Sequence, residues 1–383
     1  MVQALSLTRP ARPHAARDLP GIVRGAVEAG RDEADVLRRL PASLLEALRA
    51  AGAFRLSTPR ELGGFEASLS ESLEVLECLA RLDGPVAWNV WNGNLGFSAA
   101  LLPAAGVDRI WGDGADPVIA NSARPTGVGV EVDGGFALSG RWDMVSAADS
   151  ADWIALFGTV SPGDRPDVRV FYTRRADITV LDTWDVTGMR GTGSGSVVAD
   201  GVLVPGDLVV SPFGPARIDR PLYRIPAFTL ASTGCAAVVL GIAAAAVEEI
   251  VALAPGKGTD NGMLAGRGYA QSAVSGTDAA LRAARLLLLA AAADVDEAAV
   301  AGAVPLALRG ALRGAMCHAA STARDALTAM YALGSSVSLY RGGRLERLFR
   351  DGFAAAQHGL LAAGHQETAG RIRLGLDAGT PIF

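Results

Sequence analysis

The segment Arg344-Leu-Glu-Arg-Leu-Phe-Arg-Asp-Gly-Phe-Ala-Ala-Ala-Gln-His358 is the one place in the chain where charge, a histidine and helical spacing coincide. Asp351, Ala354, Ala355 and His358 follow one another at i, i+3, i+4 and i+7, which predicts one face of a helix. The small residues between the two polar ends leave space beside this helix for a flat or bulky molecule. The segment therefore predicts a C-terminal helix with a site beside it.

Outward from this segment, the chain divides into three regions of different texture. Residues from about 15 to 115 show helical spacing, with predicted helices at 37–51, 68–82 and 85–102. Residues from about 117 to 212 alternate apolar with polar side chains, and glycine-rich turns recur at roughly 8–12 residues, which is typical of short antiparallel strands. From about residue 225, four long helical segments follow at 230–253, 266–294, 305–333 and 345–363.

This order predicts an α+β fold in which a four-helix bundle follows an antiparallel β region. We expect an N-terminal α-helical domain at 1–116, a middle β-barrel or sandwich domain at 117–214 and a C-terminal helical bundle domain at 215–383. The chain has no G-x-G-x-x-G after a strand and no G-x-x-x-x-G-K-[ST] motif. Any nucleotide cofactor is therefore expected to be held in another way.

Composition narrows the function classes. The chain has 383 residues, of which 50% are hydrophobic and 20% charged, and its net charge of −5 includes no long basic block, so nucleic acid is not an expected partner. Cys78, Cys235 and Cys317 form no C-x-x-C pair, which predicts neither a zinc site nor a disulfide framework. Residues 1–14 lack the apolar region of a signal peptide, and the apolar run 281–293 is shorter than the roughly 20 residues of a bilayer span. We expect a cytoplasmic protein with no metal and no membrane partner.

Several motifs, in this order, resemble those of the acyl-CoA dehydrogenase superfamily. They cover about nine-tenths of the chain and are the P-x-E-x-G-G-like residues 59–64, the strand pair 136–153, the G-x-r-g-T-g-S-like residues 187–194, the helix start 240–243 and the C-terminal match 331–351. Within the superfamily, the chain is most similar to the two-component (group D) flavin-dependent monooxygenases with a type-2 acyl-CoA dehydrogenase C-terminal domain. Their last helix has an R-D pair followed by a histidine, as in Arg350, Asp351 and His358.

This resemblance implies an oxidoreductase that takes reduced FMN or FAD from a separate NAD(P)H flavin reductase. With O2 as co-substrate, a C4a-hydroperoxyflavin would hydroxylate or N-oxygenate a small aromatic or natural-product substrate. Dehydrogenases of the superfamily remove an acidic proton with a glutamate, whereas an imidazole with a pKa of about 6.5 suits proton transfer near neutral pH. The resemblance also implies a homo-oligomer, a tetramer or dimer, because members complete the flavin site across subunits.

Two other functions stay open. The first is an acyl-CoA dehydrogenase-like FAD oxidoreductase acting on a thioester, for which Glu367 is a possible displaced base. The second is a non-catalytic flavin-binding homologue. The presence of both His358 and Ser146 favours an enzyme over the second alternative.

The resemblance assigns the catalytic roles to His358 and Ser146. His358 is expected to act as acid or base, against the alternative of a histidine that only packs on a buried helix face. Ser146 matches a serine beside flavin N5 and C4a, where a hydroxyl or a backbone N–H can donate to the oxygenated flavin. An ordinary strand serine is the alternative. Ala147 stands where the family has a glycine, so the chain departs from the family's pattern at this position of the backbone.

The remaining candidates are cofactor and substrate contacts. Expected cofactor-binding residues, besides Ser146, are Asn121, Ser122, Met144, Trp184, Arg267, Gly334 and Ser335. Expected substrate-binding residues are Trp88, Asn92 and Asn94, because asparagines conflict with the helix propensity of this apolar segment, and such local conflicts tend to mark sites. An asparagine here replaces a pocket histidine of the hydroxylases. We place the tryptophans at 142, 153 and 184 on strands, and for them the alternative role is core packing. For the other candidates, the alternatives are a plain turn at 121–122, an exposed Arg267 and a C-cap glycine at Gly334.

Overall fold

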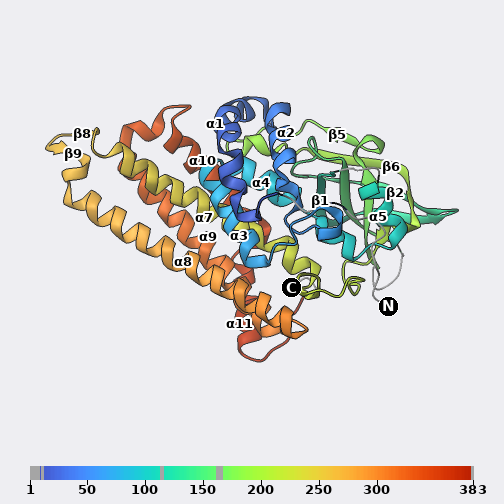
Figure 1. The fold of residues 1–383 in the computed structure, drawn as a ribbon. Coiled ribbons are helices and arrows are strands. Elements are labelled where there is room, and N and C mark those ends of the chain that lie inside the picture. Colours follow the sequence, from blue (N-terminus) through green and yellow to red (C-terminus); the bar gives the residue numbers. More distant parts are fainter. Residues whose placement is uncertain (1–8, 10–12, 113–115, 161–166, 381–383) are drawn as a thin grey trace.

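The computed structural model describes residue 9 and residues 13–112, 116–160 and 167–380. Figure 1 shows the larger β-sheet at one end and the long C-terminal helices α7, α8 and α9 running away from it. The N-terminal helices lie across the junction of the two, so that α3 and α4 pack against α7. This junction is where the sheet, the N-terminal helices and the C-terminal bundle come closest together.

The described residues of the N-terminal part form five α-helices. They are α1 (Leu19–Leu37), α2 (Ala42–Ala51), α3 (Leu69–Leu82), α4 (Gly84–Asn92) and α5 (Ala104–Trp111). Ser68 is the N-cap of α3, and its hydroxyl accepts from the backbone N–H of Glu71. The predicted helix at 85–102 is wrong, because α4 ends at Asn92 and a separate 3₁₀ helix, η4 (Gly96–Ala100), follows. The predicted helix at 37–51 begins too early, since left-handed Arg38 ends α1 and α2 starts at Ala42.

The larger sheet has seven strands in the order β5-β6-β2-β1-β3-β4-β7. The strands are β1 (Ile119–Val132), β2 (Gly135–Trp142), β3 (Trp153–Thr159), β4 (Val168–Arg174), β5 (Thr179–Leu181), β6 (Ser196–Pro205) and β7 (Val209–Val210). All pairs are antiparallel except β1 and β3, which are parallel, so the purely antiparallel prediction is wrong at this pair. These strands fall within the predicted middle domain, and the domain boundaries stay a prediction.

The parallel pair has a structural consequence. Strands β2 and β3 lie on opposite sides of β1, so residues 143–152 must cross from one side to the other. This crossover contains Met144, Ser146 and Ala147. The loop that carries the predicted flavin contacts is therefore fixed at both ends by strands of the same sheet.

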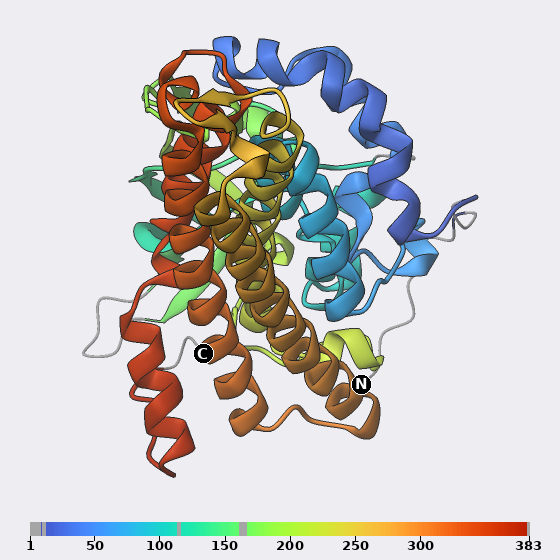
Figure 2. The ribbon, with the colours of Figure 1, turned by 90° about the vertical axis from the view of Figure 1, so that its left-hand side faces the viewer.

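The C-terminal part is helical, as predicted. After the short α6 (Pro221–Arg224), it contains α7 (Ala227–Leu253), α8 (Gly268–Ala301), α9 (Leu306–Gly334), α10 (Arg344–Ala356) and α11 (Gly364–Arg373), with a two-stranded hairpin of β8 (Gly258–Thr259) and β9 (Gly262–Met263) before α8. Helix α11 packs against α9 and extends along the side of the bundle (Figure 2). Within the described residues, α7 is long and apolar enough by length and composition to cross a membrane, and 67% of its most apolar window is buried inside the protein.

The end of α10 differs from the prediction. The helix stops at Ala356, and His358 is extended (φ −60°, ψ 134°) as the N-cap of the 3₁₀ helix η11 (Gly359–Leu361). The predicted helix to residue 363 is therefore wrong, and His358 does not share a helix face with Asp351. The turn at Gln357 redirects the chain, so the imidazole reaches α4 instead of continuing along α10.

Candidate functional site

Three rings and one hydroxyl meet at the junction of the sheet and the helices. The ring of His358 lies 5.3 Å from that of Trp88 and 5.4 Å from that of Trp91, both in edge-on geometry. The indole N–H of Trp88 donates to the hydroxyl of Ser146 over 3.1 Å. The two predicted catalytic residues, His358 and Ser146, are thus brought together through one tryptophan of α4. Trp91 has no predicted role in the sequence, although it stands one helical turn from Trp88.

His358 is held in its neutral form. Burial and, to a smaller extent, the positive charge of Arg124 together lower its pKa from 6.5 to about 4. Its Nδ1 accepts a hydrogen bond of 3.3 Å from the backbone N–H of Leu360. In the neutral ring the proton therefore resides on Nε2. At pH 7 the imidazole offers a hydrogen-bond donor at Nε2 without a positive charge.

A chain of buried hydroxyls extends from Ser146 into the protein. Ser146 Oγ lies 2.8 Å from Ser194 Oγ, which lies 2.6 Å from Thr192 Oγ1. Thr192 Oγ1 in turn donates to the carbonyl of Met189 over 2.9 Å. Ser194 and Thr192 were not predicted as site residues, although both lie in the glycine-rich motif at 187–194. The signal available in the sequence was that these two hydroxyl residues stand two positions apart on one loop.

An ion-pair network fixes this loop to the helices. The backbone N–H of Met189 donates to Asp351 Oδ1 over 2.6 Å. Asp351 is 3.5 Å from Arg347, which also binds Asp83, the N-cap of α4, over 2.7 Å. All three charged side chains are buried. The network therefore sets where the helix that carries Trp88 lies relative to the loop that carries Ser194.

Backbone strain is concentrated in the same region. Met144, Ala147 and Met189 all have positive φ, at 59°, 63° and 57°, a conformation that side chains disfavour. The backbone N–H of Ala147 donates to the carbonyl of Thr192 over 3.0 Å. The alanine thus keeps the left-handed backbone that the family's glycine would adopt with less strain.

Other predicted residues join the site through the same loops. Asn92 donates to the carbonyl of Trp88 over 3.0 Å and accepts at its own carbonyl from Asn121 of β1 over 3.3 Å. Ser122, the next residue of β1, is buried. The prediction of a strand at Trp184 is wrong, because it follows β5 in a loop, where its indole N–H donates to Met189. Met144 exposes 54% of its surface at the crossover.

Asn94 has a structural role that the sequence does not reveal. It lies beyond the end of α4, and its side chain donates to the carbonyl of Ala53 over 2.6 Å. The backbone carbonyl of Asn94 accepts from the hydroxyl of Ser57 over 2.9 Å. The asparagine-rich segment therefore holds loops in place as well as lining a cavity.

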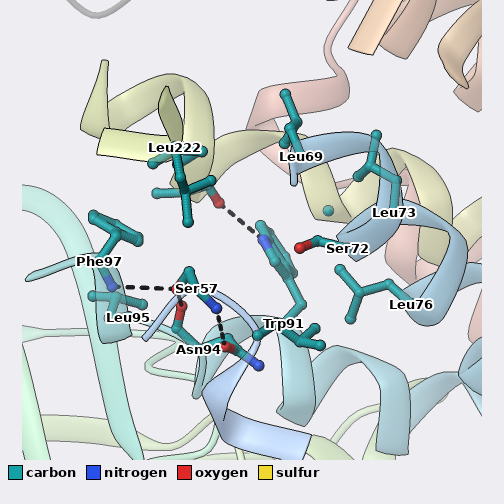
Figure 3. A pocket seen from close by; sticks show the side chains of 14 residues that line it. Ser57, Leu69, Ser72, Leu73, Leu76, Trp91, Asn94, Leu95, Phe97 and Leu222 are labelled. Carbon is teal, nitrogen blue, oxygen red and sulfur yellow. Dashed lines mark hydrogen bonds between the residues drawn. The ribbon is translucent and has the colours of Figure 1, made fainter. Parts of the chain in front are cut away.

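That cavity lies beside Trp91 (Figure 3), where α3, α4 and the start of α7 meet. Its walls are mainly leucine side chains, and its polar side chains are Ser57, Ser72 and Asn94. No charged side chain lines it within the described part of the chain. Trp91 is part of this lining and also contacts His358, so one indole separates the cavity from the imidazole.

Three predicted cofactor residues do not join this site within one chain. Arg267 precedes α8 beside the β8–β9 hairpin, at the end of the molecule away from the sheet in Figure 1, and its guanidinium lies 6.0 Å from the ring of Tyr269. Gly334 has a right-handed conformation (φ −63°), so the C-cap explanation is wrong for it. A Cβ there would lie 2.1 Å from Ser338 Oγ, so close packing requires the glycine. The positive φ belongs to the exposed Ser335.

The described residues contain no group of three or more histidine, cysteine or acidic side chains that could hold a metal ion. The site therefore consists of a neutral imidazole, two indoles and a set of uncharged hydrogen-bonding groups. Such a set can bind a flat neutral ring and offer it a hydrogen-bond donor at His358 Nε2.

Comparison with known proteins shows the family of the chain. Residues 233–363 match the family described as acyl-CoA dehydrogenase, C-terminal domain. Indole-3-acetate monooxygenase of Pseudomonas putida is 30% identical over 90% of this chain and 89% of its own length. The HsaA oxygenase subunit of a flavin-dependent monooxygenase from Rhodococcus jostii is 31% identical over 85% of this chain and 89% of its own.

Solved structures have the same fold over nearly the whole length. XiaF from Streptomyces sp., in complex with FADH2 and glycerol, superposes with a TM-score of 0.90 at 27% identity, covering 96% of each chain. The 3-HSA hydroxylase from Rhodococcus sp. RHA1 gives a TM-score of 0.91 at 26% identity, covering 97% of this chain and 99% of its own. The chain belongs to the flavin-dependent monooxygenases with the acyl-CoA dehydrogenase fold.

Proposed function

We propose that this chain is the oxygenase component of a two-component system, which takes reduced FMN or FAD from a separate NAD(P)H flavin reductase and uses O2 to hydroxylate or N-oxygenate a small substrate. The observation that carries the proposal is the neutral His358, packed by Trp88 and Trp91 and linked through Trp88 to Ser146. Glu367 is exposed on α11, so it does not provide the general base that thioester dehydrogenation needs.

The residues around Ser146 fit a flavin. An isoalloxazine ring is flat and apolar on its faces and has hydrogen-bonding groups on its edges. Ser146 and Asn121 are uncharged polar groups, while Trp88, Met144 and Trp184 offer apolar surface near the same loops. When bound, reduced flavin would supply the electrons that activate O2. His358 would donate a hydrogen bond from its neutral Nε2–H, and the surrounding rings would exclude water from it.

We propose that the substrate is uncharged and enters the cavity beside Trp91. A buried carboxylate or ammonium group needs a charged or multiply hydrogen-bonded partner, and this lining offers only two serines and an asparagine. The relative named for indole-3-acetate acts on an acid. We therefore expect this chain to prefer neutral aromatic compounds over the corresponding acids.

One experiment tests the function. The purified protein is mixed anaerobically with reduced FMN or FAD and then with isotopically labelled O2 and a panel of neutral aromatic compounds. We expect a product that has gained one labelled oxygen atom, as detected by mass spectrometry. Tight binding of oxidised FAD that is bleached by an acyl-CoA, with no labelled product from any compound, would support the dehydrogenase alternative instead.

Trp91 provides a test of the substrate site. Trp91→Phe keeps an aromatic wall but frees space, so larger substrates should gain in kcat/KM relative to the best wild-type substrate by about tenfold. Competition between pairs of substrates of different length measures this ratio. Leu203→Phe, at an exposed position of β6, is the control that should leave the ratio unchanged. An unchanged ratio in Trp91→Phe would place the substrate elsewhere.

We further propose that the protein is a dimer or tetramer in the cytoplasm. Arg267, Gly334 and Ser335 lie apart from the Ser146 loop, so they can contact a flavin only if another subunit presents its site to them. Exposed apolar side chains on α8, among them Leu286 and Leu287, provide surface for such a contact. Three free cysteines and the need for NAD(P)H through the reductase support a reducing compartment.

A further inference from the structure

The hydroxyl chain behind Ser146 has a direction, which follows from counting protons. Each hydroxyl has one proton to donate, whereas the carbonyl of Met189 can only accept. Thr192 must therefore use its proton on Met189. Ser194 must then donate to Thr192, and Ser146 must donate to Ser194.

The direction of hydrogen bonding is also fixed at the Ser146 end of the hydroxyl chain. The indole N–H of Trp88 can only donate, so Ser146 Oγ accepts from it. Ser146 has thus used its proton and one of its two lone pairs. Toward a molecule bound beside it, the hydroxyl can offer the second lone pair and no proton.

Reversing this direction would be costly. If Ser194 donated to Ser146, Thr192 would have to donate to Ser194 and would lose its hydroxyl bond to Met189. The Met189 carbonyl would keep the indole N–H of Trp184 and the backbone N–H of Thr192 as donors, but it would face the Thr192 oxygen across 2.9 Å with no proton between the two. Thr192 and Ser194 are buried, so water does not compensate for the loss. The Met189 turn cannot easily move away, because Asp351 and the indole of Trp184 both bind its peptide groups.

We propose that Ser194 and Thr192 are positioning residues that make Ser146 a hydrogen-bond acceptor toward the flavin, and that this favours binding of the reduced over the oxidised cofactor. Reduced flavin has an N–H donor at N5, whereas oxidised flavin has only a lone pair at that atom. An acceptor at Ser146 therefore matches the reduced ring and opposes the oxidised one. The inference rests on the proposed function, in that it requires flavin beside Ser146, but it assigns new roles to Ser194 and Thr192.

The test is a comparison of binding constants. Dissociation constants for oxidised and for anaerobically reduced FMN and FAD are measured by fluorescence titration for the wild type, Ser194→Ala and Thr192→Val. We expect the wild type to bind reduced flavin more tightly. In Ser194→Ala, the Ser146 hydroxyl is free to donate, so the affinity for oxidised flavin should rise relative to reduced flavin by about tenfold or more. Thr192→Val should shift the ratio in the same direction.

Ser98→Ala is the matched control, because Ser98 is a buried serine that accepts from Tyr172 in a separate hydroxyl pair. It should keep the wild-type ratio of the two dissociation constants. The proposal is overturned if the wild type shows no preference, if folded Ser194→Ala and Thr192→Val keep the wild-type ratio, or if Ser98→Ala shifts the ratio equally. Absence of binding to either redox form in the wild type would instead contradict the proposed function itself.

Discussion

His358 is surrounded by groups that disfavour its charged form. Its ring is buried against two indoles, and the charge that affects its pKa is the positive charge of Arg124. A histidine with an ordinary pKa would be partly protonated near pH 6.5 and would lose its neutral form below it. The burial of this imidazole extends the neutral form well into the acid range.

This shift predicts how stability depends on pH. Because the pKa of His358 is about 4 in the folded chain and 6.5 when unfolded, the unfolded chain binds the proton more readily between these values. The contribution of His358 is favourable above pH 6.5 and is lost as the pH falls toward 4. Urea denaturation at pH 7.5 and pH 5 should show a smaller loss of stability for His358→Gln than for the wild type. Equal losses in both proteins would mean that His358 has an ordinary pKa.

Ala147 gives a second prediction at the residue scale. Its φ of 63° is tolerable for alanine but strained for a β-branched side chain. We expect Ala147→Val to lose at least about 2 kcal/mol in the free energy of unfolding. Ala147→Gly should change the same quantity by less than about 1 kcal/mol, since relief of strain offsets the greater entropy of the unfolded chain. Similar stability of the valine and glycine variants would show that the backbone can relax at this position.

Individual residues were predicted with mixed success. His358, Ser146 and Trp88 were predicted and lie together, and Asn92 and Asn121 join them. The roles of Ser194 and Asp351 in positioning the loop were not predicted, because they depend on contacts between segments about 50 and 160 residues apart. Sequence spacing reports which residues share one element, but it does not report which elements meet.

Helix α10 connects the N-terminal helices to the loop that carries Met189, because it contacts both. Its buried Asp351 and Arg347 bind the Met189 turn and the N-cap of α4. Gly188 lies where a Cβ would come 2.0 Å from the carbonyl of Arg350, so the loop and helix are in direct backbone contact. A shift of α10 would therefore move Trp88 and the hydroxyl chain relative to each other.

The Asp351 carboxylate tests this coupling. Asp351→Ala removes the acceptor for Met189 and leaves Arg347 with less compensation, so it should destabilise the protein by about 3–5 kcal/mol. Asp351→Asn keeps an acceptor oxygen and should lose less. Chemical denaturation gives the free energies, and flavin titration shows whether the loop is still formed. Equal destabilisation by both variants would indicate that charge, not the bond to Met189, is what matters.

The helices and strands show which structural features can be predicted from sequence patterns. The long helices α7, α8 and α9 were predicted within a few residues at most ends, because apolar periodicity and flanking Pro or Gly define them locally. The ends of α4 and α10 were missed, since Asn94 and His358 are held by tertiary contacts beyond those helices. The parallel pairing of β1 with β3 was missed because strand alternation does not encode the direction of the neighbour.

At the scale of the whole molecule, the order of helical, β and helical regions was sufficient to predict the fold. Composition changes sharply at the two junctions, and the motifs follow in a fixed order. Neither signal reports how subunits assemble. The surface that we propose for assembly consists of exposed side chains on α8, which in a single sequence are indistinguishable from buried ones.

The proposed assembly gives a prediction. Leu286 is 64% exposed on α8, and burial of such a side chain against a second copy would stabilise an oligomer. Leu286→Asp should lower the mass measured by light scattering and weaken flavin binding, because each flavin would lose contacts from the neighbouring subunit. Glu297→Asp, on the same helix, should keep both. A monomeric wild type would contradict the assembly, and a dissociated variant with unchanged flavin affinity would contradict a shared site.

The two tryptophans beside His358 also make the site visible to light. Indole emission responds to the polarity and charge of its surroundings, and a protonated imidazole quenches it far more than a neutral one. Trp88 and Trp91 are therefore built-in optical reporters, which respond to the charge of His358, to displacement of the indole of Trp91 and to a flavin that absorbs their emission. The chain has six tryptophans, so the share of the emission that Trp88→Phe and Trp91→Phe remove identifies the response of these two to cofactor loading, substrate entry and proton uptake, without an attached dye.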